Sequence, residues 1–167
     1  MPSSAVATLP EPLPTPWVGD APGELSGEVT AALLRIRDVA PAQYPADFAG
    51  IATGTQESKD ILVIYLADAT NDTETALLEM SGLPAEKVKF EPAYQSLEAA
   101  SIVDRTIMAG IQSLRLQGIE LQTFGVGVDG VEDIGMDHPT DDQVAYLFDK
   151  YGPYLRIDRN VGPARLL

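Results

Sequence analysis

Three glycines in the segment TFGVGVDGVEDIG have the spacing of a loop that binds dinucleotides. Gly125, Gly127 and Gly130 form a G-x-G-x-x-G motif. In nucleotide-binding proteins such a loop follows a strand and opens a helix, whose amino end supplies the amides that hold the pyrophosphate. Here the glycines alternate with apolar residues, as in a strand, and the acids that follow would repel a phosphate. We therefore expect no nucleotide to bind this segment.

The same segment has the pattern of a β-hairpin. Asp129-Gly130 is a turn signal. Pairing Val126 with Ile134, and Phe124 with Met136, would keep the apolar side chains on one face of the hairpin.

The opposite face of this hairpin would be rich in glycine. The predicted register sets Gly125 opposite Gly135, and Gly127 opposite Asp133. Two interpretations stay open: a twisted hairpin that tolerates glycine, or a flat patch on which another main chain or an aromatic ring packs. The second interpretation makes Gly125, Gly127 and Gly135 candidate binding residues.

The only histidine, His138, lies in a run of acids that ends at the start of a predicted helix. A catalytic triad would need a serine and a carboxylate that converge on its ring, and the chain has no G-x-S-x-G motif. Calcium prefers several carboxylate oxygens, but no D-x-D-x-D-G loop is present, and the helix dipole alone explains acids at a helix start. A metal or acidic site, and with it a small hydrolase or isomerase, stays open at Asp129, Asp133, Asp137, His138 and Asp141. No cofactor is expected.

The charge balance excludes several classes of partner. The chain of 167 residues has 25 acidic and 11 basic residues, which gives a net charge of −14. Nucleic acids and anionic membranes bind through Lys and Arg, so we expect neither as a partner. The absence of cysteine excludes disulfides and thiolate chemistry. The amino-terminal residues have no basic and apolar leader, so the default expectation is a soluble cytoplasmic protein, with secretion open if a leader has been removed.

The chain divides into an arm and two similar units. Residues 1–23 hold six prolines and predict a flexible, extended arm, anchored by Trp17. The first unit, residues 24–95, begins with a helix from Ser26 that Pro41 ends. A hairpin follows, DFAGIATG and DILVIYLAD, separated by TQESK. Its second strand is apolar on both faces, which predicts cover on both sides.

A helix and a strand complete the first unit. The helix begins at about residue 72, is capped by Asn71 or Asp72, and ends at Gly82. The strand is VKFEP, with Val88 and Phe90 directed inward.

Residues 96–117 predict a long connecting helix capped by Ser96. Residues 118–167 then repeat the order strand, strand, helix, strand, with Thr140 and Gln143 as a capping box and a carboxyl-terminal tail. The predicted fold is therefore α+β, with two β-β-α-β units joined by a long helix. The units would form two three-stranded sheets or one merged sheet, with helices on one face.

Residues 44–160 resemble the propeptides of secreted bacterial chymotrypsin-like serine proteases of the alpha-lytic protease and streptogrisin type. The resemblance lies in YPADFAGIATG, DILVIYLAD, FEPAYQSLEAA and the hairpin, helix and strand after residue 118. Ser96 matches the start of the family's long helix, and Ile134 and Met136 stand at its V-x-V strand.

Such propeptides assist the folding of their protease and inhibit it. The resemblance implies a docking surface on strands 121–128, 132–138 and 154–160, with the tail 161–167 inserted into the partner. The residues added to the candidate site on this basis are Arg156, Asp158, Leu166 and Leu167. We therefore predict a non-enzymatic protein-binding module that pairs a sheet edge with its partner, which could be a serine protease. Self-association is the alternative.

Overall fold

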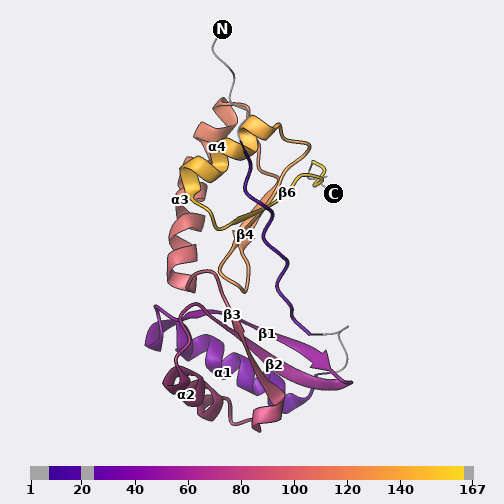
Figure 1. Ribbon diagram of the computed structural model, residues 1–167, viewed down its shortest axis with the longest axis vertical. Coiled ribbons are helices and arrows are strands. Elements are labelled where there is room, and N and C mark those ends of the chain that lie inside the picture. The colour runs from indigo at the N-terminus through magenta and orange to yellow at the C-terminus, as the bar shows by residue number, and fades with distance from the viewer. Residues whose placement is uncertain (1–7, 20–24, 164–167) are drawn as a thin grey trace. The chain divides into compact units, whose positions relative to one another are not determined.

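The computed structural model describes residues 8–19 and 25–163, and it is an α+β fold with two three-stranded sheets (Figure 1). The elements are α1 (Gly27–Gln43), β1 (Phe48–Gln56), β2 (Lys59–Leu66), α2 (Asn71–Ser81), η1 (Ala85–Lys87), β3 (Val88–Pro92), α3 (Leu97–Leu116), β4 (Thr123–Val126), β5 (Glu132–Gly135), α4 (Asp141–Tyr151) and β6 (Leu155–Asp158). None of the helices in the described part of the chain has the length and apolar character that a membrane crossing requires.

The described chain forms two units, each with one sheet. Residues 15–101 and 127–131 belong to the unit that we call the β1–β3 unit. The rest belongs to the β4–β6 unit. Both sheets have the same topology, because the first two strands are antiparallel and the third returns through a helix to pair in parallel with the second. The predicted pseudo-repeat is confirmed, and the units form two sheets.

The β1–β3 unit is built around the central strand β2, whose apolar residues Ile61 to Leu66 are all buried. Leu62, Ile64 and Leu66 pack into one cluster with residues of α1 and α2. The alternate residues, Ile61 among them, pack on the other face with Trp17, Ala93 and Val128. The predicted cover on both faces is confirmed, and Trp17 is the anchor that the sequence indicated.

Three boundaries in this unit differ from the predictions. Pro41 does not end α1, which continues to Gln43. A proline at this position removes only one amide hydrogen bond from the helix. The Tyr44 amide still donates to the Ala40 carbonyl at 2.8 Å. The cap of α2 is Thr70, whose hydroxyl accepts from the Thr73 amide.

The turn between β1 and β2 is also shorter than the predicted five residues. The strands pair up to Gln56 and Lys59, so the turn consists of Glu57 and Ser58. Both have positive φ angles, 51° and 65°, as a tight hairpin requires.

The core of the β4–β6 unit lies between its sheet and the helices α3 and α4. Ile107 and Leu114 of α3 and Leu147 of α4 are fully buried against Ile134 and Leu155 of the sheet. The capping box predicted at Thr140 and Gln143 is present, and Ser96 accepts a hydrogen bond from the Ala99 amide at the start of α3. These predictions are confirmed.

The register of the second hairpin is not the predicted one. Gly125 lies opposite Asp133, and Gly135 lies opposite Thr123. Gly127 has left the strand: its amide donates to the Val131 carbonyl and closes a three-residue loop. The shift is two residues, so each side chain keeps its predicted face.

The reason for the shift lies in the loop. Gly130 adopts φ +77° and its amide donates to the Gly127 carbonyl, which is the geometry of a turn followed by a left-handed residue. The side chain of Asp129 accepts from the Val131 amide. A three-residue loop moves the pairing two residues from the one that the apolar pattern alone predicted.

Candidate functional site

The best candidate site is the face of the β4–β6 sheet that is turned away from its helices, which we call the outer face. Alternation along the strands sets the residues of this face, because their neighbours Ile134 and Leu155 point into the core. In the sheet Asp133 lies beside Arg156, and Gly135 beside Asp158. The outer face comprises Thr123, Gly125, Asp133, Gly135, Arg156 and Asp158. Four of the predicted binding residues therefore share one surface: Gly125, Gly135, Arg156 and Asp158.

The guanidinium of Arg156 is fixed by the carboxylate of Asp133 and also binds the main chain of a second segment. Its Nη1 donates to Oδ1 of Asp133 at 2.6 Å. Its Nε donates to the carbonyl oxygen of Leu13 at 3.3 Å, and its Nη2 donates to that of Pro14 at 2.8 Å. The planar fork of a guanidinium can satisfy all three acceptors at once. Only 15% of the side chain is exposed.

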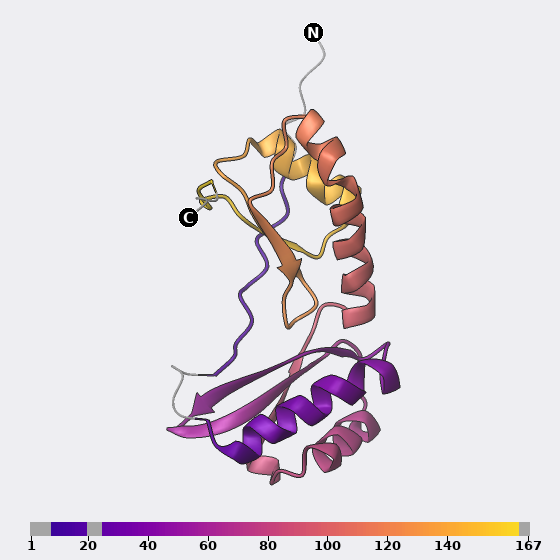
Figure 2. The same cartoon turned by 180° about the vertical axis from the view of Figure 1, so that it is seen from behind.

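The carbonyls bound by Arg156 belong to the amino-terminal arm. Figures 1 and 2 show this segment as an extended stretch that passes β6. Leu9 and Leu13 are half-buried, whereas the prolines at positions 10, 12 and 14 are exposed. The arm is thus held by two leucine side chains and by its main chain. Proline contributes by favouring the extended conformation.

A shallow depression of about 390 Å³ lies where the arm meets the end of α4. Its lining residues are Thr8, Leu9, Pro10, Ala145, Phe148, Asp149, Gly152 and Pro153. The aromatic ring of Phe148 gives this depression an apolar wall. Leu9 borders it, so this is the contact that holds the beginning of the described arm.

The glycines of the outer face are not equivalent. A Cβ atom added to Gly125 would meet no heavy atom within 4 Å, so the surface above this residue is open. A Cβ atom added to Gly135 would meet the Thr123 hydroxyl and the side chain of Val161. The predicted bare patch opposite Gly125 therefore does not exist, because Asp133 and not Gly135 lies there and Val161 covers Gly135.

Close approach of main chain to glycine does occur, but on β1. A Cβ atom at Gly50 would overlap the main chain of Val128, and one at Gly54 would overlap the carbonyl of Val18. Both approaches lie within the β1–β3 unit. The signal in the sequence was the spacing G-I-A-T-G, which puts two glycines and Ala52 on one face of a strand.

The acids of the predicted metal or acidic site are paired separately. Asp137 lies 2.6 Å from Nδ1 of His138, in a pair whose side chains are 41% and 81% exposed. Asp141 pairs with Arg159 at 2.8 Å, and Asp133 pairs with Arg156. Asp129 is buried in the β1–β3 unit. Residues 8–19 and 25–163 contain no group of three or more acids or histidines that could hold a metal ion.

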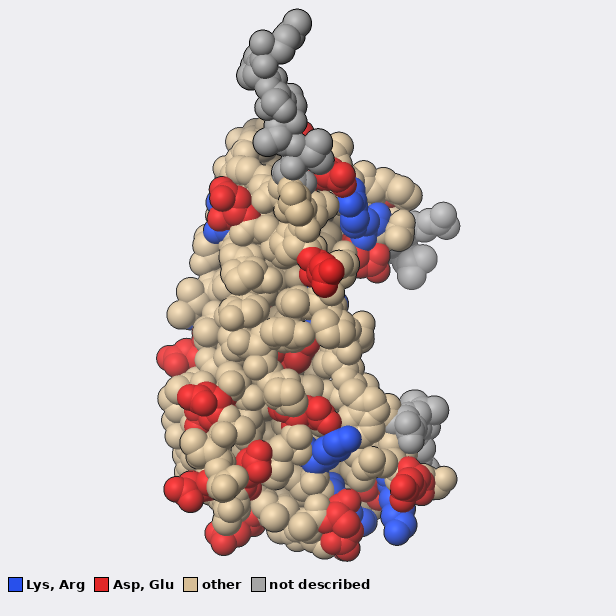
Figure 3. All heavy atoms as spheres, in the orientation of Figure 1, with Lys and Arg blue, Asp and Glu red and all other residues tan. Residues whose placement is uncertain are grey.

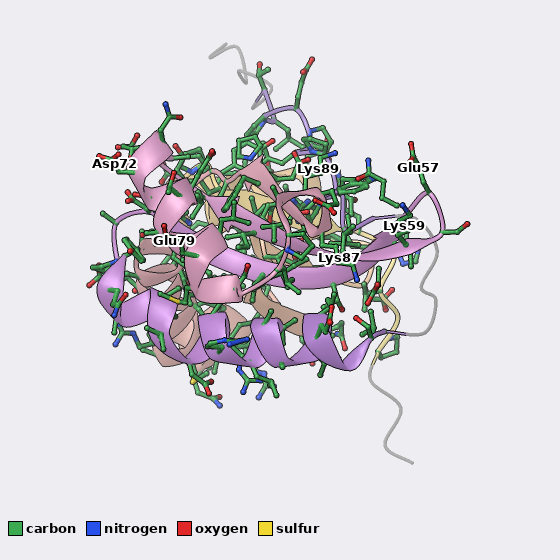
Figure 4. The ribbon with its side chains drawn as sticks, turned by 90° about the horizontal axis from the view of Figure 1, so that it is seen from below. Glu57, Lys59, Asp72, Glu79, Lys87 and Lys89 are labelled. Atoms are coloured by element: carbon green, nitrogen blue, oxygen red, sulfur yellow. The ribbon has the colours of Figure 1, made fainter. Side chains whose placement is uncertain are left out.

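A second depression, of about 530 Å³, lies at the hairpin end of β1 and β2. Figure 4 shows Lys59 and Lys87 at this end of the sheet. Nζ of Lys87 lies 3.7 Å from Asp60 and 3.8 Å from Glu28, so its charge is already compensated. The Ser26 amide donates to Asp60 at 2.7 Å. Hydrogen bonds from Ser26, helped by Lys87, lower the pKa of Asp60. These contacts fix the start of α1 to β2.

One chemically unusual residue was missed by the sequence predictions. Glu132 is 0% exposed, and neither of its carboxyl oxygens has a hydrogen-bond partner in the described structure. Burial, and next the nearby carboxyl of Asp104, raise the pKa of Glu132 to about 8. In the alternation of the strand, Glu132 lies on the same face as Ile134 and Met136, which are core residues. The sequence therefore did carry a signal of a buried acid.

No protein-family model matches this chain, and neither does any curated protein. The predicted resemblance to protease propeptides stays a prediction. Leu166 and Leu167, which that resemblance added to the candidate site, lie outside the described residues. The basis for a functional proposal is therefore the outer face, its arginine and the segment that this arginine holds.

Proposed function

We propose that this chain is a non-enzymatic protein-binding module whose outer face binds an extended segment of protein. The observation that supports this most is the pair of hydrogen bonds from Arg156 to the carbonyls of Leu13 and Pro14. Carbonyl oxygens are present in every residue, so such a contact recognises an extended main chain and not a particular side chain. Arg156 is fixed beforehand by Asp133, which reduces the entropy lost on binding.

The arm also indicates what kind of segment would bind. An apolar side chain at the position of Leu13, and another four residues before it, would repeat the half-buried pattern of the arm. Proline between them would keep the segment extended at a low entropic cost. Because the arm is part of the same chain, it competes with any partner at a high effective concentration. A partner must therefore displace the arm, or bind while the arm is detached.

Two partners fit this proposal. A secreted serine protease is the partner implied by the propeptide resemblance, and it would offer an extended loop to the outer face. A second copy of the chain would offer its own arm, and the mass in solution would then rise with concentration. Both partners use the same surface, so one experiment tests the surface itself.

The test uses the full chain with a weakened arm. In the double variant Leu9→Ser, Leu13→Ser, the arm should release the outer face. A fluorescent peptide with the sequence of residues 8–16 should then bind with a dissociation constant between about 10 µM and about 1 mM, as measured by anisotropy. The unmodified chain should bind the same peptide at least about tenfold more weakly, because its arm competes.

A matched pair of arginine substitutions completes the test. Arg156→Ala, added to the double variant, should abolish peptide binding. Arg159→Ala should leave it unchanged, because Arg159 pairs with Asp141 and not with the arm. Equal binding by the two arginine variants, or no binding by the double variant at about 1 mM peptide, would refute the proposal.

A further inference from the structure

A tryptophan of the amino-terminal arm packs on the β1–β3 sheet, on the face that is turned away from α1 and α2. Trp17 lies against the buried side chains of Ile61, Val63 and Tyr65. Figures 1 and 2 both show the described arm reaching β1. We call the surface that receives this ring the tryptophan socket, and it comprises Ala49, Gly54, Ile61, Val63, Tyr65 and Lys89.

The socket is separate from the main core of the unit. The helices α1 and α2 form their own cluster with Leu62, Ile64 and Leu66, which lie on the other face of β2. That cluster does not include Trp17. The unit therefore keeps a complete core on its helical side when the ring leaves the socket.

The charge of Lys89 favours an aromatic side chain in the socket. Its Nζ lies 4.1 Å from the centroid of the Trp17 ring. The carboxylate of Glu91 lies 3.3 Å from the same nitrogen and helps to hold it over the ring. A cation is attracted to the electron-rich face of an indole, whereas an aliphatic side chain offers no such face. The socket therefore discriminates between an aromatic ring and other apolar groups.

The main chain that follows the ring is recognised by a close approach to β1. A Cβ atom at Gly54 would overlap the carbonyl group of Val18, so the strand accepts main chain here only because it carries glycine. Gly19 has φ +96°, and a Cβ atom on it would lie 2.8 Å from the main-chain nitrogen of Thr55. The side chain of Val18 is 41% exposed, which leaves its identity free. The socket thus fits an aromatic residue, then any residue, then glycine.

Both units use the corresponding face of their sheet in the same way. The two sheets have the same topology, and in each of them the face away from the helices holds a part of the arm. In the β4–β6 unit, Arg156 binds the carbonyls of Leu13 and Pro14. In the β1–β3 unit, the socket binds the ring of Trp17.

We propose that the tryptophan socket is a second binding site, and that its ligand is a segment of a partner protein with an aromatic residue, any residue and then glycine. In the chain by itself, Trp17, Val18 and Gly19 occupy the socket and act as an internal ligand. A partner segment binds by exchanging with them. The socket contains no residue of the outer face, so this inference does not depend on peptide binding by Arg156.

The test uses the full chain and the fact that Trp17 is its only tryptophan. Trp17→Ala removes the ring from the socket and all tryptophan fluorescence from the chain. The probe is the blocked peptide Thr-Pro-Trp-Val-Gly, which has the sequence of residues 15–19. Its emission should shift to the blue in a saturable way, with a dissociation constant between about 0.1 mM and about 3 mM, because Val18 and Gly19 of the chain still compete.

Two changed peptides test the chemistry of the ligand. The Gly19→Ala peptide should bind at least about tenfold more weakly, because its methyl group would overlap the main chain of Thr55. The Trp17→Leu peptide should not compete with the probe at the same concentrations, because it has no ring for Lys89.

Three substitutions in the Trp17→Ala chain test the socket itself. Lys89→Ala should weaken binding of the probe by about threefold to tenfold. Gly54→Ala should abolish it, since the atoms nearest to the added methyl group belong to Val18 and Gly19. Lys59→Ala is the control, because Lys59 is exposed at the hairpin end of the same sheet (Figure 4), and it should leave binding unchanged.

A second variant keeps the proposal testable if circular dichroism shows that Trp17→Ala is unfolded. Trp17→Leu keeps an apolar side chain in the socket, and it should bind the probe more weakly than Trp17→Ala would. The proposal is overturned if neither variant shifts the emission of the probe at about 3 mM, or if the probe and the Gly19→Ala peptide bind equally. It is also overturned if both variants are unfolded, because the ring is then a fixed part of the core. A mass of the unmodified chain that rises with concentration, and does not rise in Trp17→Ala, would assign the socket to a second copy instead of a partner protein.

Discussion

At the scale of single residues, Gly130 is a position where both the backbone conformation and the available space require glycine. Its φ angle is +77°, and a Cβ atom would overlap the main-chain carbonyl of Gln95. The two segments are held together here, because the side-chain amide of Gln95 donates to the Gly130 carbonyl and the Tyr94 amide donates to the Asp129 carbonyl, each at 2.9 Å. We expect Gly130→Ala to lower the free energy of unfolding by about 2–4 kcal/mol, measured by urea denaturation.

The matched control for this substitution is Gly125→Ala. Gly125 lies in the same hairpin, in a strand, with no heavy atom within 4 Å of the added methyl group. Removing glycine from such a place restricts the unfolded chain, so stability should stay the same or rise by up to about 1 kcal/mol. Similar losses in both variants would show that the close contact at Gln95 is not what makes Gly130 necessary.

At the scale of elements, the apolar pattern predicted the strands and helices because it follows burial. The unbroken apolar run from Ile61 to Leu66 reflects burial on both faces of β2, and the helical spacing in α3 reflects burial of every third to fourth residue. Boundaries were less predictable. A single side chain decides them, such as the Thr70 hydroxyl at the start of α2.

Register and long-range contacts could not be read from the pattern. The hairpin of β4 and β5 keeps the same faces in two registers that differ by two residues, so only the loop geometry at Gly130 decides between them. The outer face was predictable because it depends on alternation alone. The contact between Arg156 and Leu13 was not, because it joins residues that are 143 positions apart and uses a main-chain carbonyl.

The capping box of α4 is an element-scale feature with a measurable contribution. The hydroxyl of Thr140 accepts from the Gln143 amide at 3.2 Å, and the side chain of Gln143 accepts from the Thr140 amide at 3.0 Å. Thr140→Ala removes the first bond and should cost about 1 kcal/mol in urea denaturation. Hydrogen exchange should become faster at the Gln143 amide.

The control for the cap is a threonine inside a helix. Thr106 is exposed in α3, and its hydroxyl donates to the Ile102 carbonyl at 2.7 Å, which the helix already satisfies. Thr106→Ala should therefore leave stability unchanged or raise it slightly, because alanine has the higher helix propensity. If both threonine variants lost the same free energy of unfolding, the cap at the helix start would contribute no more to stability than a threonine inside a helix.

At the scale of the whole molecule, negative charge is the dominant property. The net charge is −14, and Figure 3 shows acidic side chains scattered over the visible face of both units. Repulsion between these charges opposes the folded state and weakens as the pH approaches the isoelectric point of about 4.2. Surface repulsion and the buried Glu132 therefore both predict lower stability at higher pH. They differ in their response to salt.

The buried acid contributes a pH dependence of known sign. The pKa of Glu132 is about 8 in the folded state against a usual 4.5, so the folded chain holds its proton more tightly than the unfolded chain. The contribution of Glu132 to the free energy of unfolding is complete below pH 4.5 and is lost as the pH rises through 8. Between these values the free energy of unfolding should fall as the pH rises, because the folded chain binds one proton that the unfolded chain has lost.

Salt separates the two effects. At about 0.5 M NaCl the surface charges are largely screened, whereas a fully buried carboxyl group is not. In this salt, urea denaturation should still show a loss of stability for the unmodified chain between pH 5 and pH 8. Glu132→Gln should lose most of that dependence, because its amide does not titrate, and Glu120→Gln should keep it. If salt alone abolished the pH dependence of the unmodified chain, surface repulsion would be its whole cause, and the buried Glu132 would not control the stability of the fold.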